Sequence, residues 1–157
     1  SKLEKDRIEY AKNLLTKATN MGVELLLPAD HVVVRELDKG ADSRVVSGNI
    51  PEDMLGVDIG PETVLRFKRA IGDARTILWN GPLGIFEIEP FSKGTREVAE
   101  FITGLDAVTV IGGGDTASAF SQFGLKDKVS HVSTGGGASL EFLEGRELPG
   151  IAALQDK

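Results

Sequence analysis

The stretch VTVIGGGDTASAF, residues 108–120, decides the fold predicted for this chain. Residues 108–111 are β-branched, which favours a short strand, and the glycines at 112–114 permit a tight turn. A helix then begins at Asp115 or Thr116, because both residues favour helix starts. A short apolar strand followed by a helix is the repeating unit of a parallel α/β sheet.

Two further segments have the same order of strand, glycine-rich loop and helix. The strand at 76–79 is followed by the loop at 80–84, and the strand at 128–133 is followed by Gly135–Gly137. Ligands of such sheets bind beyond the carboxyl ends of the strands, so we expect the three loops to converge on one site. Free N–H groups at helix N-termini attract phosphate. Glycines used only for tight turns are the alternative.

The other elements are predicted from apolar periodicity and turn residues. They are a helix over 1–21 with a capping box of Ser1 and Glu4, a buried strand at 23–27, a hairpin of 31–36 and 44–47, an irregular segment at 48–60, a helix from Pro61, a helix capped by Ser92, and a short helical stretch within 148–157. This order predicts an α/β domain. Its centre is a parallel Rossmann-like sheet with helices on both faces, in three α/β/α layers, with a small β-hairpin insertion.

The composition excludes several classes of function. The 157 residues suffice for one domain, and the net charge of −6 argues against a nucleic-acid surface. The chain has no cysteine and two histidines, which excludes disulfides, thiol catalysis and a histidine-rich metal site. We see no signal peptide and no apolar run long enough for a membrane helix, so we expect no membrane contact.

Two known sequence motifs, the P-loop and the dinucleotide fingerprint, limit the classes of phosphate ligand that the chain could bind. The chain has no G-x-x-x-x-G-K-[ST] sequence, which excludes a P-loop. Gly112-x-Gly114-x-x-Ala117 matches a dinucleotide fingerprint, but the next strand ends in Ser133-Thr134 without the acidic residue that NAD binding requires. An NAD-binding domain therefore stays a weaker alternative.

Two acidic residues near these loops are candidate ligands. Asp115 at a phosphate-binding helix start would repel phosphate unless Mg²⁺ bridged the two, and Mg²⁺ commonly binds one or two carboxylates with substrate oxygens. A helix N-cap is the alternative role for Asp115. Glu87 follows the apolar run 83–86 and could accept hydrogen bonds from ribose hydroxyls, or it could be a solvated surface residue.

Four long motifs resemble segments of the phosphoglycerate kinases, and together they extend over essentially the whole chain. They are GVDIGP at 56–61, with Val57 where the family usually has leucine, WNGPLGIFE at 79–87, VIGGGDTA at 110–117 and SHVSTGGGASLE at 130–141. The family transfers the acyl phosphate of 1,3-bisphosphoglycerate to Mg-ADP, giving 3-phosphoglycerate and Mg-ATP. The resemblance therefore implies a glycolytic phosphotransferase that uses Mg²⁺ and ATP or ADP.

The resemblance also implies a role for individual residues. The adenine would be bordered by Gly56, Val57, Pro82 and Ile85, and the ribose would be bound by Glu87. Asn80 would face the phosphates, and the phosphate chain would be held by Gly112, Gly113, Gly114, Asp115 and Thr116. Asp115 would also bind Mg²⁺, and the N–H groups of Gly113 and Gly136 would point at the transferring phosphoryl. His131 would lie near the hinge between domains, although a partly buried strand histidine is the alternative.

Family members are much longer than this chain. The resemblance implies that residues 1–157 are the later part of a C-terminal nucleotide-binding domain, without the N-terminal domain that binds 3-phosphoglycerate or 1,3-bisphosphoglycerate. We expect a cytoplasmic, monomeric parent enzyme and an inactive isolated piece. A nucleotide-binding module without chemistry is the second hypothesis. We also expect the strand at 23–27 to form an exposed sheet edge.

Overall fold

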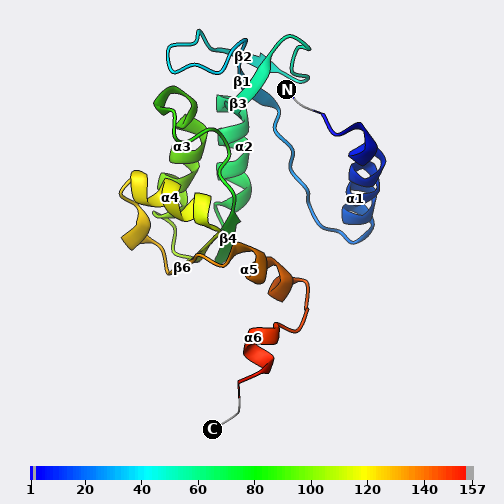
Figure 1. The fold of residues 1–157 in the computed structure, drawn as a ribbon, viewed down its shortest axis with the longest axis vertical. Helices are drawn as coiled ribbons and strands as arrows, with labels where there is room; N and C mark the ends of the chain where they lie inside the picture. The colour runs from blue at the N-terminus through cyan, green and yellow to red at the C-terminus, as the bar shows by residue number, and fades with distance from the viewer. Residues whose placement is uncertain (2, 155–157) are drawn as a thin grey trace.

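The centre of the molecule is a three-stranded parallel sheet (Figure 1). The computed structural model describes residue 1 and residues 3–154. Strands β4 (Thr76–Asn80), β5 (Val108–Gly112) and β6 (His131–Ser133) lie side by side in that order. This confirms the predicted α/β fold and the three strands that precede the glycine-rich loops.

Helices flank both faces of this sheet. Helices α2 (Pro61–Ile71), α3 (Lys93–Ile102) and α4 (Gly114–Gln122) bury their apolar side chains against one face. Helix α5 (Gly136–Leu143) lies beside the other face, with a cavity of about 570 Å³ between them. The core on the first face consists of Ile59, Val64, Trp79, Val98, Ala99, Ile102, Ile111, Phe120 and Leu125.

A second, antiparallel sheet lies above the first in Figure 1. It contains β1 (Asp30–Val34), β2 (Arg44–Ser47) and β3 (Leu55–Ile59) in the order β2-β1-β3. The predicted hairpin is confirmed as β1 and β2. The prediction of an irregular segment at 48–60 is wrong, because β3 pairs along the free edge of β1. Strand β3 contains Gly56 and Asp58, and because glycine and aspartate are poor strand formers, its sequence does not predict a strand.

The N-terminal helix lies apart from the body of the molecule (Figure 1). A 3₁₀ turn over Lys5–Arg7 leads into α1 (Ile8–Asn20), and neither buries a residue. The predicted capping box is wrong, because the hydroxyl of Ser1 accepts a hydrogen bond from the N–H of Gly56 instead. Lys2 lies outside the described residues.

The predicted strand at 23–27 is absent. Residues 22–28 have no regular structure, and Val23 and Leu27 are more than half exposed. A strand needs a partner for its N–H and C=O groups, and no described strand pairs with this segment. In the described part of the chain, the parallel sheet instead has β4 and β6 as its two edge strands, and each of them pairs with β5 alone.

Smaller differences concern where elements begin and end. Ser92 precedes α3, but its hydroxyl donates to the carbonyl of Glu89 and caps no helix N–H. Strand β6 begins later than predicted, because residues 126–128 form a 3₁₀ turn. The predicted C-terminal helical stretch is α6 (Pro149–Ala152), and its last residues, 155–157, lie outside the described part.

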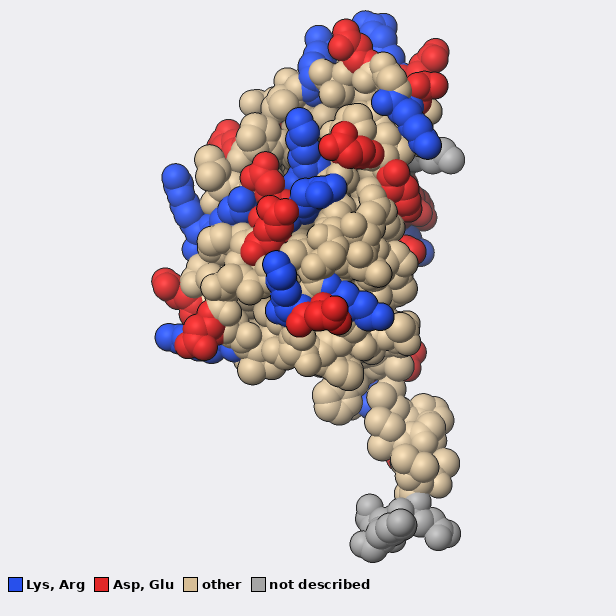
Figure 2. Space-filling view, turned by 90° about the vertical axis from the view of Figure 1, so that its left-hand side faces the viewer, with Lys and Arg blue, Asp and Glu red and all other residues tan. Residues whose placement is uncertain are grey.

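Charged side chains of both signs are interspersed on the face of the molecule in Figure 2. Among the described residues, no helix has the length and apolar character needed to cross a bilayer.

Candidate functional site

The three glycine-rich loops meet at the carboxyl end of the parallel sheet, as predicted. Asn80 at the end of β4 is in register with Gly112 of β5, which is in register with Ser133 of β6. The loop after β6 comes so close that a Cβ atom added to Gly136 would lie 2.7 Å from the Cα of Gly113. It would also lie 3.4 Å from the side-chain nitrogen of Asn80. Because Gly136 has no side chain, the loop after β6 can approach the backbone of Gly113 more closely than any other residue would allow.

Gly113 forms the turn between β5 and α4. Its φ of 93° lies in the left-handed region that favours glycine, and its carbonyl accepts the N–H of Ala117 to begin the helix. Its own N–H donates to the carbonyl of Ser133 at 3.0 Å. The expectation that this N–H points at a transferring phosphoryl is therefore wrong in this arrangement. The donors left without an intrahelical acceptor at the start of α4 are those of residues 114–116.

Thr116 connects the loop after β4 to the start of α4. Its side chain is buried, and its hydroxyl oxygen accepts the N–H of Gly81 at 2.7 Å. The indole N–H of Trp79 donates to the carbonyl of Gly81 and holds the same turn from the other side. These bonds place Asn80 beside Gly112 and Gly113.

Asp115 is exposed in the first turn of α4. Gly113 is the N-cap, so Asp115 lies inside the helix and the N-cap alternative for it is wrong. No group of three or more potential ligands (His, Cys, Asp or Glu) is close enough to hold a metal ion among the described residues. A single carboxylate beside free N–H groups fits Mg²⁺ that takes its remaining ligands from phosphate oxygens and water.

A cavity of about 340 Å³ lies between β3 and the loop after β4. Four residues expected to border an adenine share its lining. The lining residues are Ser1, Pro28, His31, Ile50, Gly56, Val57, Asp58, Ile59, Pro82, Leu83, Gly84 and Ile85. None of them is lysine or arginine. Pro82 of this lining directly follows Gly81, whose N–H donates to the hydroxyl of Thr116 at the start of α4.

The family of the chain follows from comparison with known proteins. The family model for phosphoglycerate kinase matches residues 1–146. The chain belongs to the phosphoglycerate kinase family. It is 52% identical to the phosphoglycerate kinase of Thermosipho africanus and 55% identical to that of Clostridium perfringens. Each alignment includes 100% of this chain but 40% of the relative, so the chain spans less than half of these proteins.

Solved structures of phosphoglycerate kinases have the same fold. The structure from Coxiella burnetii matches 95% of this chain and 38% of its own, with a TM-score of 0.88 and 41% identity. The structure from Pyrococcus horikoshii matches 96% and 36%, with a TM-score of 0.80 and 32% identity. The family assignment made from the four motifs is thus confirmed.

The phosphoglycerate kinase motifs fall into two neighbouring groups. Asn80, residues 112–116 and Gly136 surround the carboxyl end of the sheet, whereas Gly56, Val57, Pro82 and Ile85 line the cavity. Glu87 is exposed and is not part of the cavity lining. Its place near the ribose therefore stays a prediction, as does the hinge role of His131, whose side chain is exposed in β6.

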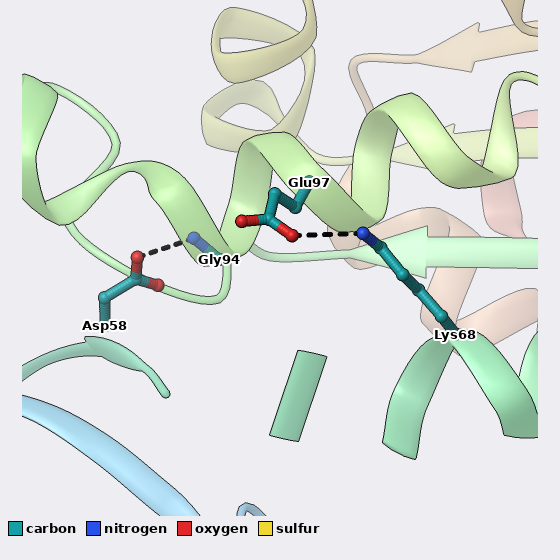
Figure 3. A network of polar contacts seen from close by, with 4 residues as sticks. All are labelled: Asp58, Lys68, Gly94 and Glu97. Atoms are coloured by element: carbon teal, nitrogen blue, oxygen red, sulfur yellow. Dashed lines mark hydrogen bonds and ion pairs between the residues drawn. The ribbon is translucent and has the colours of Figure 1, made fainter. Parts of the chain in front are cut away.

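Sequence reasoning missed two buried polar residues beside the cavity. The carboxylate of Asp58 accepts the N–H groups of Ile59 at 2.9 Å and Gly94 at 2.7 Å, and the latter bond holds the start of α3 (Figure 3). The hydroxyl of Thr95 accepts the N–H groups of Leu83 and Gly84. Asp58 lies within the GVDIGP motif, and this could have marked it as a candidate site residue. Thr95 lies outside the four motifs, so no comparable pattern pointed to it.

Burial and, to a smaller extent, the nearby charge of Glu97 raise the pKa of Asp58 to about 6, against the opposing effect of the hydrogen bonds from Gly94 and Ile59. The folded state therefore holds the proton more tightly than the unfolded state does. The contribution of Asp58 to stability is greatest when it is protonated and falls as the pH rises toward 6 and just beyond.

Because of this group, we expect the free energy of unfolding to fall by about 1–2 kcal/mol as the pH rises from 5 to 7.5. Urea unfolding of the wild type and of Asp58→Asn at both pH values measures the difference, since the variant lacks the titrating group. An equal pH dependence in the two proteins would contradict the prediction.

Proposed function

We propose that this chain forms the Mg-ATP- and Mg-ADP-binding part of a phosphoglycerate kinase, in which phosphoryl is exchanged between 1,3-bisphosphoglycerate and ADP. The observation that carries the proposal is the meeting of three glycine-rich loops beside the cavity between β3 and residues 82–85. The cavity would receive the base, and the loops would receive the phosphates.

The proposed chemistry depends on position and charge. Phosphoryl transfer needs little covalent participation from a protein, so alignment and charge stabilisation dominate. The N–H groups of residues 114–116 would bind phosphate oxygens, with Asn80 facing them. Gly112 and Gly113 would form the turn that holds the phosphate chain, and the N–H of Gly136 would point at the transferring phosphoryl. Asp115 would hold Mg²⁺, which neutralises phosphate charge when bound. Glu87 would bind the ribose hydroxyls.

We propose that the isolated chain binds nucleotide without catalysing the reaction. The chain spans 40% of its curated relatives, and the cavity lining carries no lysine or arginine for a phosphorylated three-carbon acid. The second substrate, 3-phosphoglycerate or 1,3-bisphosphoglycerate, would bind to the N-terminal part. The parent would be a cytoplasmic monomer. A coupled assay on the chain, with and without that part, tests this, and turnover by the chain alone would contradict it.

Titration separates this proposal from the alternatives. We expect the chain to bind Mg-ADP more tightly than NADH in isothermal calorimetry, because β6 ends in Ser133 without the acidic residue of a dinucleotide site. Tighter binding of NADH would overturn the proposal. Binding of Mg-ADP without activity after addition of the N-terminal part would favour a binding module without chemistry.

Asp115→Ala is expected to weaken the binding of Mg-ADP about tenfold while changing the affinity for metal-free ADP much less. The reason is the loss of the proposed metal ligand, since Asp115 is exposed and does not cap α4. Calorimetric titrations with Mg²⁺ and with EDTA measure both affinities. Asp127→Ala, an exposed aspartate in a 3₁₀ turn, is the control. Equal weakening of both ligands would argue against the metal role.

A further inference from the structure

Residues 82–85 form one wall of the cavity between β3 and the loop after β4. Three successive N–H groups hold this wall in place. Those of Leu83 and Gly84 donate to the hydroxyl oxygen of Thr95 at 3.0 and 3.1 Å, and that of Ile85 donates to the carbonyl of Val57 at 2.8 Å. One side-chain atom therefore fixes two of the three anchored amides.

The hydroxyl of Thr95 is itself held at a fixed position. Thr95 is fully buried in the first turn of α3, and the preceding Gly94 donates its N–H to the carboxylate of Asp58. Asp58 belongs to β3, which supplies the opposite wall of the cavity. A Cβ atom on Gly84 or Gly94 would collide with the Asp58 carboxylate, so wall, helix and strand are in close contact.

We propose that Thr95 is a positioning residue for the base of a bound nucleotide, acting through residues 82–85 rather than by touching the ligand. The proposal rests on the proposed function of the cavity. Its physical basis is that a preformed wall avoids the cost of ordering a loop during binding. Pro82 and Ile85 present apolar surface to the cavity only while the intervening amides stay anchored.

The change Thr95→Val tests the proposal with almost no change in side-chain volume. It leaves two N–H groups without their acceptor, and such groups favour a rearrangement that exposes them to water. We expect the affinity for Mg-ADP to fall about tenfold, while the affinity for Mg-pyrophosphate, which has no base, stays within about twofold. Calorimetric titration of the 157-residue chain measures both.

Two controls separate positioning from stability. Thr95→Ser keeps the accepting hydroxyl and is expected to restore most of the Mg-ADP affinity. Thr109→Val makes the same substitution at another buried threonine, whose hydroxyl accepts the N–H of Ser130 in the parallel sheet away from the cavity. It should lower the melting temperature without changing the ratio of the two affinities.

Amide hydrogen exchange gives a readout that needs no ligand. The N–H groups of Leu83 and Gly84 should exchange faster in Thr95→Val than in the wild type, and at wild-type rates in Thr95→Ser and Thr109→Val. Failure of the wild type to bind Mg-ADP would overturn the proposed function and the role of Thr95 with it. Binding by the wild type with an unchanged Thr95→Val affinity, or equal losses for both ligands, would overturn the positioning role alone.

Discussion

Asp30→Ala is expected to lower the free energy of unfolding by about 3–4 kcal/mol, the largest effect on stability that we predict for a single substitution. Asp30 lies at the start of β1 with 3% exposure. Its carboxylate accepts the N–H of Glu62 at 3.0 Å and the N–H of Thr63 at 2.8 Å. It also accepts the hydroxyl of Thr63 at 2.6 Å.

These bonds replace a missing helix cap. Helix α2 begins at Pro61 after Gly60, which has no side chain to cap it, and a Cβ atom there would collide with Asp30. Asp30 thus supplies from β1 the oxygen that an N-cap residue normally supplies. In the alanine variant the buried donors of Thr63 lose their charged acceptor, and unpaired buried donors are costly.

The charge state of Asp30 gives the expected pH dependence. Burial alone would raise the pKa of Asp30, but hydrogen bonds from the Thr63 hydroxyl, the Thr63 N–H and the Glu62 N–H outweigh it, so the pKa lies below its usual value. This contribution to stability is therefore present above the pKa of an unfolded aspartate, and it is lost as the pH falls through the lower pKa of the folded state. The sign is opposite to that at Asp58.

Urea unfolding at pH 7 measures the loss. Asp38→Ala is the matched control, because Asp38 accepts one N–H, that of Gly40, in an exposed turn, and its removal should cost less than about 1 kcal/mol. Equal losses in the two variants would show that the bonds between β1 and α2 contribute no more than an exposed turn does.

The strands of the parallel sheet could be predicted because each is a local apolar run followed by glycines. Strand β3 could not, since Gly56 and Asp58 argue against a strand and its pairing with β1 joins residues far apart in sequence. The segment 23–27 shows the opposite error. It has the composition of a strand, but a strand also requires a neighbour, and local composition does not reveal whether one is present.

The same distinction applies to the candidate site. The glycines at 112–114 and 135–137 indicated convergence, because the carboxyl ends of parallel strands lie at one edge. The roles of Asp58 and Thr95 depend on contacts between β3, α3 and the loop after β4, which no spacing in the sequence encodes. The role expected for the N–H of Gly113 was also wrong, because this N–H donates to the carbonyl of Ser133, a contact that only the structure shows.

Two neighbouring glycines allow the convergence of the loops to be tested. Both Gly136 and Gly137 lie in the first turn of α5, and neither has a positive φ. A Cβ atom at 137 would meet nothing within 4 Å, whereas one at 136 would lie 2.7 Å from the Cα and 3.1 Å from the nitrogen of Gly113. Alanine at both positions raises helix propensity equally, so any difference reports the contact with Gly113.

Gly136→Ala is therefore expected to weaken Mg-ADP binding about 10- to 100-fold and to lower the melting temperature. The colliding atoms at Gly113 belong to the backbone, so the loops after β5 and β6 must separate, and the N–H groups of residues 114–116 move with them. Gly137→Ala should keep the wild-type affinity and gain up to about 1 kcal/mol of stability. Calorimetric titration and thermal unfolding of both variants measure these opposite effects. If both alanines behaved alike, the close contact between Gly113 and Gly136 would not hold the loops together in solution.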